Sequence, residues 1–388
     1  MPYGALYVLG VLIQDVFVPS LSYLGTTYHL SASELQWFLN VSILGFFLGE
    51  CLIPIAFSRF SVSVVYTWIW AACLIIALIA LQCKAYSMLL IVRLLIGFCG
   101  GAMISLVRIS IEKKERHTPR GYAYASSVKF GFYACSSMLC PLVSVFLIGH
   151  YGFNSLYVFL IIMLIVLRPS FIRMSYGWSI TNFQSKTYIS SASAIVKSKD
   201  MVMAICLCGA TIALIANEVV FNALFLNKQY GCSLAWFAVY ASCVGGLNSV
   251  VRFIYPMIVK PSNQMTWFMF MLLGLLGGLM CIIYTYQQPN LMIFIMGCVL
   301  LSMCTNMLFL MIYNKTFTEL CLRYPTAGMP ILGGGMCASF LLASLLYGWL
   351  INYQLVGFII WVSIIFAILV ISFISSAKRY MANYSLAF

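Results

Sequence analysis

The sequence predicts an all-α integral membrane protein with twelve transmembrane helices arranged as two six-helix, pseudo-symmetric halves. Three observations lead to this prediction. The 388-residue chain is 63% hydrophobic and only 7% charged, whereas a soluble domain carries about 25% charged residues. Its apolar runs are each about 20 residues long, enough for a helix to cross about 30 Å of hydrocarbon. A long polar segment separates the first six runs from the last six.

The expected spans are separated by polar clusters and turn residues, such as "GTTYHLSAS", "YQQPN" and "CLRYPTAG". The first span has no basic leader and no small-residue cleavage site before it, so we interpret it as a retained helix rather than a signal peptide. The twelve spans cover residues 4–24, 35–57, 62–82, 86–111, 121–149, 153–172, 200–226, 234–258, 264–285, 290–313, 326–351 and 354–377.

The basic residues of the loops orient these spans, because cytoplasmic loops carry an excess of Lys and Arg. With the amino terminus inside, most of the 21 Lys and Arg residues lie in cytoplasmic loops, whereas Lys84 and Lys228 lie outside. We therefore expect both termini in the cytoplasm. The membrane that we expect for the protein is the inner membrane of a bacterium. Topology explains the net charge of +13, so no nucleic-acid partner is needed.

The polar segment defines the expected domains: an N-terminal half at 1–172, a cytoplasmic linker at 173–199 and a C-terminal half at 200–388. Two such halves around a site at the membrane midplane are a common transporter plan. The sequence has no HExxH or GxxxxGK motif, and Met336 follows the glycines Gly333–Gly335. The 15 cysteines form no CxxC pair and fall in apolar runs, so we interpret them as small hydrophobic side chains. We expect no enzyme activity, no cofactor and no metal.

Ionisable residues inside spans are costly, so they usually pair or line a water-filled path. A rise of about 1.5 Å per residue places Asp15 and Arg93 at similar depths, about 16 and 20 Å from the inner surface. Glu50 and Lys129 lie at about 8 and 12 Å. The sequence thus predicts two pairs of opposite charge. The intramembrane set is Asp15, Glu50, Arg93, Arg108, Lys129, Glu218 and Arg252.

Structural interpretations compete with functional ones for this set. The long side chains of Arg108 and Arg252 are expected near the inner ends of their helices, where they reach the interface. Glu218 lies near the outer end of its span and either reaches water or faces the cavity. Asp15 and Arg93 form either a structural ion pair or a functional one, and both alternatives place them at the cavity wall.

Small residues spaced four apart recur in three spans and are expected to let helix backbones approach closely. They occur in "GFFLG", "GFCGG" and "GLLGG". The expected packing positions are Gly45, Gly49, Gly97, Gly101, Gly274 and Gly278.

Four stretches in the first half resemble the major facilitator superfamily, most closely its twelve-span drug/proton antiporters of the bicyclomycin-resistance and chloramphenicol-exporter type. "DVFVPSL" resembles the first-helix Asp-x-Tyr-x-Pro pattern, with Phe17 in place of tyrosine. "LSASELQWFLNVSILGFFLGE" resembles the entry to the second helix. "RLLIGFCGGA" resembles the fourth-helix Arg-x-x-x-Gly-x-x-Gly motif, and "GFNSLYVF" resembles the segment after the fifth helix.

The sequence departs from that family pattern at three places. The loop after the second span, "PIAFSRFSVSV", keeps Arg59 but has Pro54, Ser58 and Ser61 where the family has glycine, aspartate and glycine. The fifth-helix Gly-Pro is Cys140-Pro141, and Glu50 replaces a glutamine. The resemblance implies that this loop controls the conformational switch, so whether its departures abolish or alter switching stays open. Together with Glu50 they also leave the direction of transport open.

The resemblance implies a proton-coupled secondary transporter that moves a small amphipathic molecule by alternating access, as an exporter and a monomer in the bilayer. The alternatives are an uptake carrier for a metabolite or siderophore, and a non-transporting receptor or scaffold. Burial disfavours the charged form of Asp15 and Arg93 favours it, so movement between the two environments would load and release a proton. The proton-coupling candidates are Asp15, Glu50 and Arg93, and the cavity candidates are Phe17, Lys129, Tyr133, Asn217, Glu218 and Phe221.

Overall fold

The chain is helical throughout the part that the computed structural model describes. This part comprises residues 9–10, 12–13, 15–56, 59–115, 136, 138–175, 185–260, 263–324 and 328–385, with most of their side chains. Of the sequence-predicted site residues, Lys129 and Tyr133 lie outside it, as does the side chain of Arg108. The expected all-α class is therefore confirmed.

The helices follow the expected order of spans. Their bounds are α2 Leu21–Tyr28, α3 Ala32–Ala56, α4 Val62–Ala80, α5 Tyr86–Glu115, a helix over Met138–Tyr151, α7 Ser155–Ser175, α8 Ser185–Lys197, α9 Lys199–Tyr230, α10 Leu234–Ile258, α11 Gln264–Gln287, α12 Leu291–Arg323, α13 Gly328–Leu350, the 3-10 turn η2 Ile351–Tyr353 and α14 Gln354–Ser385.

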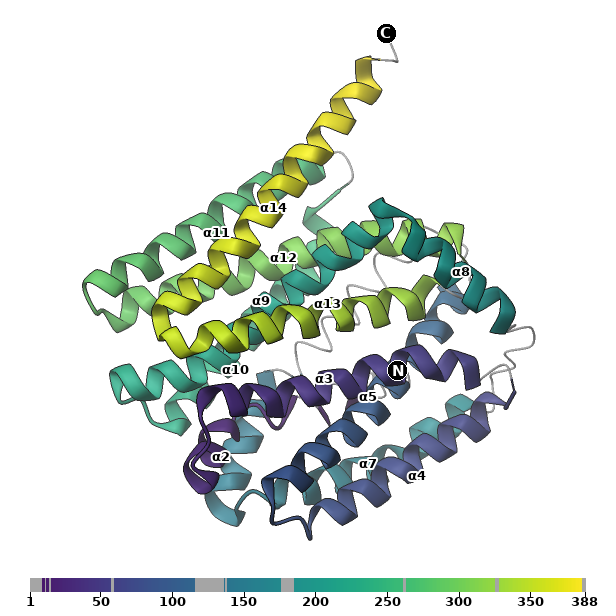
Figure 1. The fold of residues 1–388 in the computed structure, drawn as a ribbon, viewed down its shortest axis with the longest axis vertical. Coiled ribbons are helices and arrows are strands. Elements are labelled where there is room, and N and C mark those ends of the chain that lie inside the picture. The colour runs from purple at the N-terminus through teal and green to yellow at the C-terminus, as the bar shows by residue number, and fades with distance from the viewer. Residues whose placement is uncertain are drawn as a thin grey trace.

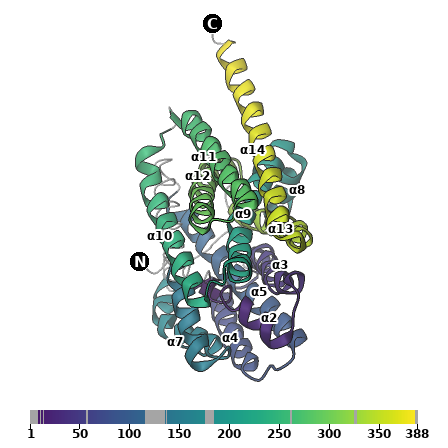
Figure 2. The same ribbon diagram turned by 90° about the vertical axis from the view of Figure 1, so that its left-hand side faces the viewer.

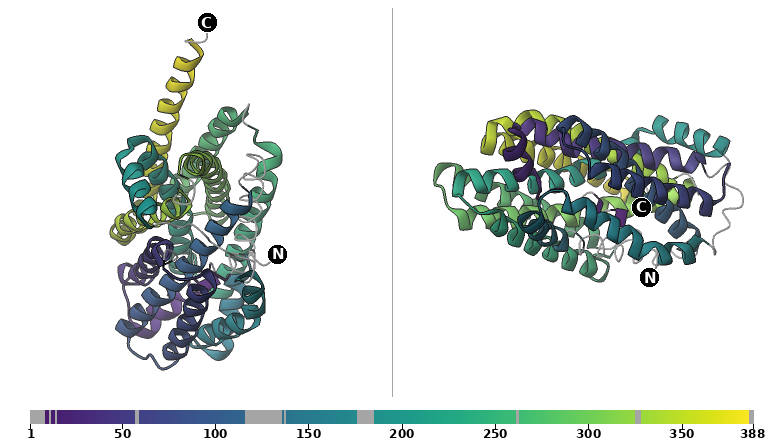
Figure 3. Two further views of the ribbon diagram at one scale, coloured as in Figure 1. Left: turned by 90° about the vertical axis from the view of Figure 1, so that its right-hand side faces the viewer. Right: turned by 90° about the horizontal axis from the view of Figure 1, so that it is seen from below.

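Helices α2 to α7 lie together in one part of the molecule, and α9 to α14 lie together in another (Figures 1 and 2). Seen from below in Figure 3, most helices of both groups run in roughly the same direction. Helix α13 packs along α3, so these two helices join the groups. Their contact is antiparallel: a Cβ on Gly348 would lie 3.2 Å from Gln36 Cγ, and one on Gly334 would lie 2.6 Å from Cys51 Sγ.

Nine helices in the described ranges are long and apolar enough to cross a membrane, and the helices at 138–151 and 155–169 are apolar but shorter. Several helices continue past the end of the expected span. The tenth expected span ends at residue 313, whereas α12 continues to Arg323. The stretch "KTFTELCLR" contains no helix breaker before Pro325, so the backbone hydrogen bonds continue beyond the apolar run.

The first span is interrupted near Pro19 rather than continuous. Helical turns end at Asp15, a series of turns covers Val16–Ser20, and α2 begins at Leu21. Across this break the amide of Val18 donates to Asp15 O and that of Ser20 donates to Phe17 O, three residues back instead of four. Proline has no amide hydrogen and its ring crowds the preceding turn. The regular hydrogen bonding of the first span is therefore broken around Pro19.

The interface between α3 and α5 is made by backbone against backbone. A Cβ on Gly45 would lie 2.7 Å from Phe98 N, and one on Gly49 would lie 2.7 Å from Ala102 N. From the other side, a Cβ on Gly101 would lie 2.7 Å from Phe46 Cα, and one on Gly97 would meet Ser42 O. Such contact increases dispersion attraction where lipid gives helices no hydrophobic drive to associate. Gly274 and Gly278 similarly face Cys304 and Leu301 of α12.

The expected polar linker contains a helix, α8, which contacts α3, α9 and α13 at one end of the molecule (Figure 1). Its Tyr188 and Ile195 side chains are buried, whereas Ile189 between them in sequence is 58% exposed. Burial raises the pKa of the Tyr188 hydroxyl, and the nearby Cys51 and Glu50 add to this rise. The linker therefore rests on the end of α3 that carries Glu50.

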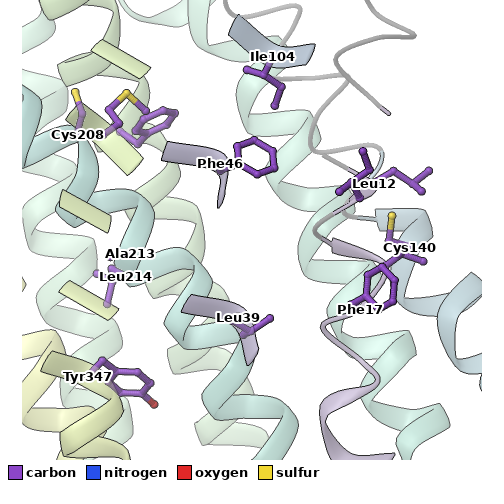
Figure 4. Close-up of a cluster of buried hydrophobic side chains, with 14 of the residues drawn as sticks. Leu12, Phe17, Leu39, Phe46, Ile104, Cys140, Cys208, Ala213, Leu214 and Tyr347 are labelled. Carbon is purple, nitrogen blue, oxygen red and sulfur yellow. The ribbon is translucent and has the colours of Figure 1, made fainter. Parts of the chain in front are cut away.

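The buried apolar side chains form one cluster that extends through both groups of helices. Figure 4 shows Leu12, Phe17 and Cys140 gathered on one side of it and Cys208, Leu214 and Tyr347 on the other. Apolar side chains also cover much of the outer surface, for example on α4 and α11. That distribution fits an exterior that faces lipid, since a soluble protein would need charges there.

Candidate functional site

A buried guanidinium lies at the centre of the α2–α7 group. Arg93 projects from α5 and is fully buried. Its Nη1 donates a 3.0 Å hydrogen bond to the carbonyl oxygen of Ile13, close to the break in the first span. Its Nε and Nη2 have no hydrogen-bond partner among the described residues. A buried cation without compensating interactions is costly. The groups around Arg93 therefore determine how its charge is stabilised.

Aromatic rings compensate for part of this charge. The guanidinium carbon lies 4.5 Å from the ring centroid of Phe17 and 5.1 Å from that of Phe38. Tyr157 of α7 packs against Phe17 at 5.0 Å between centroids and interacts electrostatically with Arg93. Ring faces attract cations, more strongly where water is excluded. Arg93 is thus held by aromatic faces from the first span and α3, with α7 behind them.

Asp15 is the acidic partner that lies near this cation. Its half-buried carboxylate interacts electrostatically with Arg93 and with the thiol of Cys140. It sits at the end of the helical turns before the break at Pro19. Just after it, the carbonyl of Val16 accepts a hydrogen bond from Ser144 Oγ. Backbone groups near the break are therefore bonded by side chains from other helices, as expected for irregular backbone at membrane depth.

The second expected pair is described only in part. Glu50 is buried on α3, where its backbone carbonyl accepts from Ser105 Oγ at 3.5 Å. Its carboxylate interacts electrostatically with Cys51 and with Tyr188 of the linker helix. The expected partner Lys129 is outside the described residues, so this pairing stays a prediction.

A chain of buried amides joins the two helix groups. Gln36 Nε2 on α3 donates to Asn217 Oδ1 on α9 at 3.2 Å, and to Asn40 Oδ1 at 3.4 Å. Ser344 Oγ on α13 donates to the same Asn217 Oδ1 at 3.2 Å. Gln36 Oε1 and Asn217 Nδ2 have no partner in the described part of the chain. Contacts of this kind stabilise one arrangement of the groups and must break if the groups separate.

The other cavity candidates occupy different places. Phe221 is buried in an aromatic stack, with its ring 4.3 Å from that of Phe358 and 4.8 Å from that of Phe225. Phe17 lies instead on the Arg93 guanidinium. The structure therefore brings Asp15, Arg93 and Phe17 together, whereas Asn217 and Phe221 lie on a separate helix, α9, and contact α3, α13 and α14.

Arg252 differs from the structural expectation, and for Glu218 the structure excludes one of the two alternatives. Arg252 does not reach the interface: it is buried, and its Nε and Nη2 both donate to Asn306 Oδ1, the first at 3.0 Å. Glu218 does not reach water, since it is only 2% exposed. Depth counted along the sequence locates a side chain along the membrane normal but says nothing of the direction in which it points.

The sequence missed several members of these sites. Phe38 and Tyr157 around Arg93 resemble any other apolar residue of their spans, and Gln36 lies in the stretch that resembles the entry to the second helix of the family. Polar residues four apart, as Gln36 and Asn40 are, lie on one helix face, and that signal was present in the sequence. In the described part of the chain, no group of three His, Cys, Asp or Glu side chains is placed to hold a metal ion.

Comparison with known proteins agrees with this architecture. The family model described as Major Facilitator Superfamily matches residues 4–321. The fold resembles the proton:xylose symporter XylE bound to 6-bromo-6-deoxy-D-glucose, with TM-score 0.70 and 14% identity over 97% of this chain and 95% of that chain. It also resembles the human organic anion transporter MFSD10 (TETRAN), with TM-score 0.68 and 11% identity over 95% and 98% of the two chains.

A third similar structure is a bacterial homologue of the human lysosomal transporter Spinster, in an inward-facing and unoccupied conformation. Its TM-score is 0.59, with 15% identity over 97% of this chain and 96% of that chain. No match was found among curated protein sequences. At these identities the structural likeness establishes the fold, and the family model establishes the family. This integral membrane protein, with its all-helical transporter fold, belongs to the major facilitator superfamily.

Proposed function

We propose that this secondary transporter is coupled to protons and exports a small amphipathic molecule across the cytoplasmic membrane by alternating access. The halves at 1–172 and 200–388 would rock against each other about a central cavity, with the linker at 173–199 between them. Membership of the superfamily supports secondary transport in general. Proton coupling and direction are the proposed refinements.

The observation that carries the coupling proposal is the charged site at the broken first helix. Asp15 lies within electrostatic range of Arg93, which has two guanidinium nitrogens without hydrogen-bond partners in the described region. When Asp15 is charged, its attraction to Arg93 stabilises the site. When Asp15 is protonated that attraction is lost, and Arg93 relies on Phe17, Phe38 and the Ile13 carbonyl. Each protonation state thus favours its own arrangement of these groups.

The break at Pro19 supports a movable carboxylate. The turns at Val16–Ser20 interrupt the regular hydrogen bonding of the helix immediately after Asp15. A small rotation there costs less than bending a continuous helix, because fewer backbone hydrogen bonds have to break. Asp15 can therefore alternate between the Arg93 side and an aqueous cavity, exchanging its proton between the two.

The proposed substrate is amphipathic because of the side chains near the contact between the halves. Asn217 and Gln36 have unused hydrogen-bonding atoms, and Phe221, on the same helix as Asn217, belongs to a buried aromatic stack. Pockets for small molecules are mostly apolar with a few placed polar groups. A molecule with apolar bulk and one or two polar groups fits this set.

The test uses inside-out membrane vesicles in which respiration builds an acid interior that a pH-sensitive dye reports. Addition of a transported compound from a panel of amphipathic cations, amino acids and siderophores should release protons in the wild type. Asp15→Asn should abolish this release while leaving the protein folded and inserted. Glu319→Gln is the matched control, because it removes an exposed carboxylate on α12.

Unchanged proton release in Asp15→Asn would overturn the coupling role. Substrate-dependent acidification of the vesicle interior, or accumulation in right-side-out vesicles, would instead indicate an uptake carrier. A protein that moves no member of the panel in either orientation would fit a receptor or scaffold.

A further inference from the structure

A second buried carboxylate lies away from the Arg93 site. Glu218 of α9 is 2% exposed, and its Oε2 has no hydrogen-bond partner in the described part of the chain. No basic side chain described there interacts with it electrostatically, in contrast to Asp15. A charged carboxylate in such a place is costly, so a structural role alone is a poor explanation for it.

Glu218 faces the interior of the C-terminal helices rather than α3 or α13. The titratable groups that interact with it are the hydroxyl of Tyr240 on α10 and the thiol of Cys298 on α12. One turn farther along α9, Asn222 Nδ2 donates to Tyr240 Oη at 3.0 Å, and Cys298 Sγ donates to Asn222 Oδ1 at 3.5 Å. The carboxylate is therefore next to a connected set of polar groups.

This set continues along the contact between α10 and α12. Asn248 Nδ2 donates to Ser302 Oγ at 2.9 Å, and Arg252 Nε donates to Asn306 Oδ1 at 3.0 Å. Tyr255 on α10 lies near Asn314 on α12, farther along both helices. We call this row the polar seam; its members are Tyr240, Asn248, Arg252 and Tyr255 on α10 and Cys298, Ser302, Asn306 and Asn314 on α12.

The seam has a direction and a length. Paired residue numbers increase together on the two helices, so α10 and α12 run parallel there. From Tyr240 to Arg252 the seam covers about 18 Å, more than half of the roughly 30 Å hydrocarbon thickness. Asn248 Oδ1 has no partner in the described region, and neither does Glu218 Oε2. Such open positions beside hydroxyl and amide groups are where single waters can be held between helices.

We propose that Glu218 is a second proton-binding site of the transporter, and that the polar seam between α10 and α12 connects it to the membrane face near the carboxyl end of α10. The carboxylate takes up one proton to become a neutral carboxylic acid, and it releases that proton when it returns to the charged form. A proton fits this site because it moves along hydrogen-bonded groups and single waters. An organic cation would require α9, α10 and α12 to part.

This inference rests on the proposed function in one respect: if transport is coupled to protons, Glu218 is a second coupling carboxylate in addition to Asp15. The binding event itself needs no transported molecule. Infrared difference spectroscopy of the full chain reconstituted in lipid measures it directly, through the carbonyl stretch of a protonated carboxyl group. Proton binding at Glu218 is therefore tested independently of transport.

The wild type is expected to show a carboxyl band that appears and disappears between mildly acidic and mildly alkaline pH. Glu218→Gln should remove this band. Asp15→Asn and the exposed-site control Glu319→Gln should retain it. If Glu218→Gln leaves every pH-dependent carboxyl band in place while the protein unfolds at the wild-type temperature, the site assignment is wrong.

The seam is tested by exchange into heavy water, which shifts the same band as the carboxyl proton is replaced. Asn248→Leu should slow this shift several-fold, because it removes an amide from the middle of the seam. Ser249→Ala is the matched control: its buried hydroxyl donates only to Gly245 O of its own helix at 2.9 Å, so the exchange rate should not change. Equal rates in the wild type and Asn248→Leu would overturn the seam as the route.

A transporter that moves no compound but keeps the Glu218 band would contradict the proposed function and leave the proton site intact. If transport still depends on Asp15 but no carboxyl band depends on Glu218, the proton site is contradicted and the proposed function stands. The two proposals therefore fail separately.

Discussion

The guanidinium of Arg93 lies over the ring of Phe17, 4.5 Å from its centroid, so a residue of the broken first span covers a buried charge on α5. The same guanidinium also donates to the backbone of that span at Ile13. Two different interactions thus attach α5 to the segment that carries Asp15. This attachment leads to the first prediction.

Phe17→Leu should destabilise the protein by about 1–2 kcal/mol, because leucine retains apolar bulk but offers no ring face to a desolvated cation. The temperature of unfolding in detergent measures the effect. Phe153→Leu is the control, since Phe153 packs on Phe17 at 6.1 Å between centroids and the arginine contacts involve Phe17 and Phe38. Equal losses in the two variants would show that the ring serves packing alone.

Gly45→Ala should cost about 1–3 kcal/mol or prevent stable insertion, because its methyl group would meet backbone atoms of Leu94 and Phe98 on α5. Backbone atoms cannot turn aside as side chains do, so the helices would have to separate. Gly149→Ala serves as the control, since a Cβ there meets nothing within 4 Å. Yield of monodisperse protein and unfolding temperature report both. A tolerated alanine at Gly45 would contradict the close packing.

Asn217→Leu should weaken the contact between the helix groups, because it removes the oxygen that accepts from both Gln36 and Ser344. Hydrogen exchange measured by mass spectrometry should increase in peptides that cover residues 29–35, next to Gln36 at the start of α3. Ser344→Ala removes only one of the two donors to that oxygen and should increase exchange less than Asn217→Leu. If exchange in these peptides is the same in all three proteins, the amides do not hold the groups together.

Tyr188→Ala should release the linker helix at a cost of about 3 kcal/mol, the usual order for truncating a large buried side chain. Trypsin should then cut faster at Lys197 and Lys199, which end α8 and begin α9. Ile189→Ala changes the exposed neighbour and should leave the cleavage rate unchanged. Similar cleavage in both variants would mean that α8 is not held by Tyr188.

Composition and span length were sufficient to predict the helical class, because they report the solvent in which the surface lies. The break at Pro19 was also predictable, since a missing amide is a property of the residue itself. The position of Arg252 was not predictable, because its place in the span indicates a depth near a helix end but not the direction toward Asn306. The helix α8 was missed because its polar, serine-rich stretch has little apolar character, and its position depends on burying Tyr188 and Ile195 against distant helices.

The site was predicted in the same partial way. Asp15 and Arg93 were identified because charges inside apolar spans stand out and their depths matched. The aromatic rings that hold Arg93 were not identified, since Phe38 and Tyr157 do not stand out among the many aromatic residues. Nor could the sequence place Gln36 against Asn217, which are 181 positions apart.

The glycine contact between α3 and α5 has a mechanical consequence. The backbones of α3 and α5 touch at four glycines, so neither helix can tilt or slide without moving the other. The two helices therefore move as one rigid unit. Arg93 belongs to this rigid unit because it lies on α5, and Gln36 belongs to it because it lies on α3. Any displacement that a change of charge causes around Arg93 is therefore passed to the amide contact with Asn217 without being absorbed along the way.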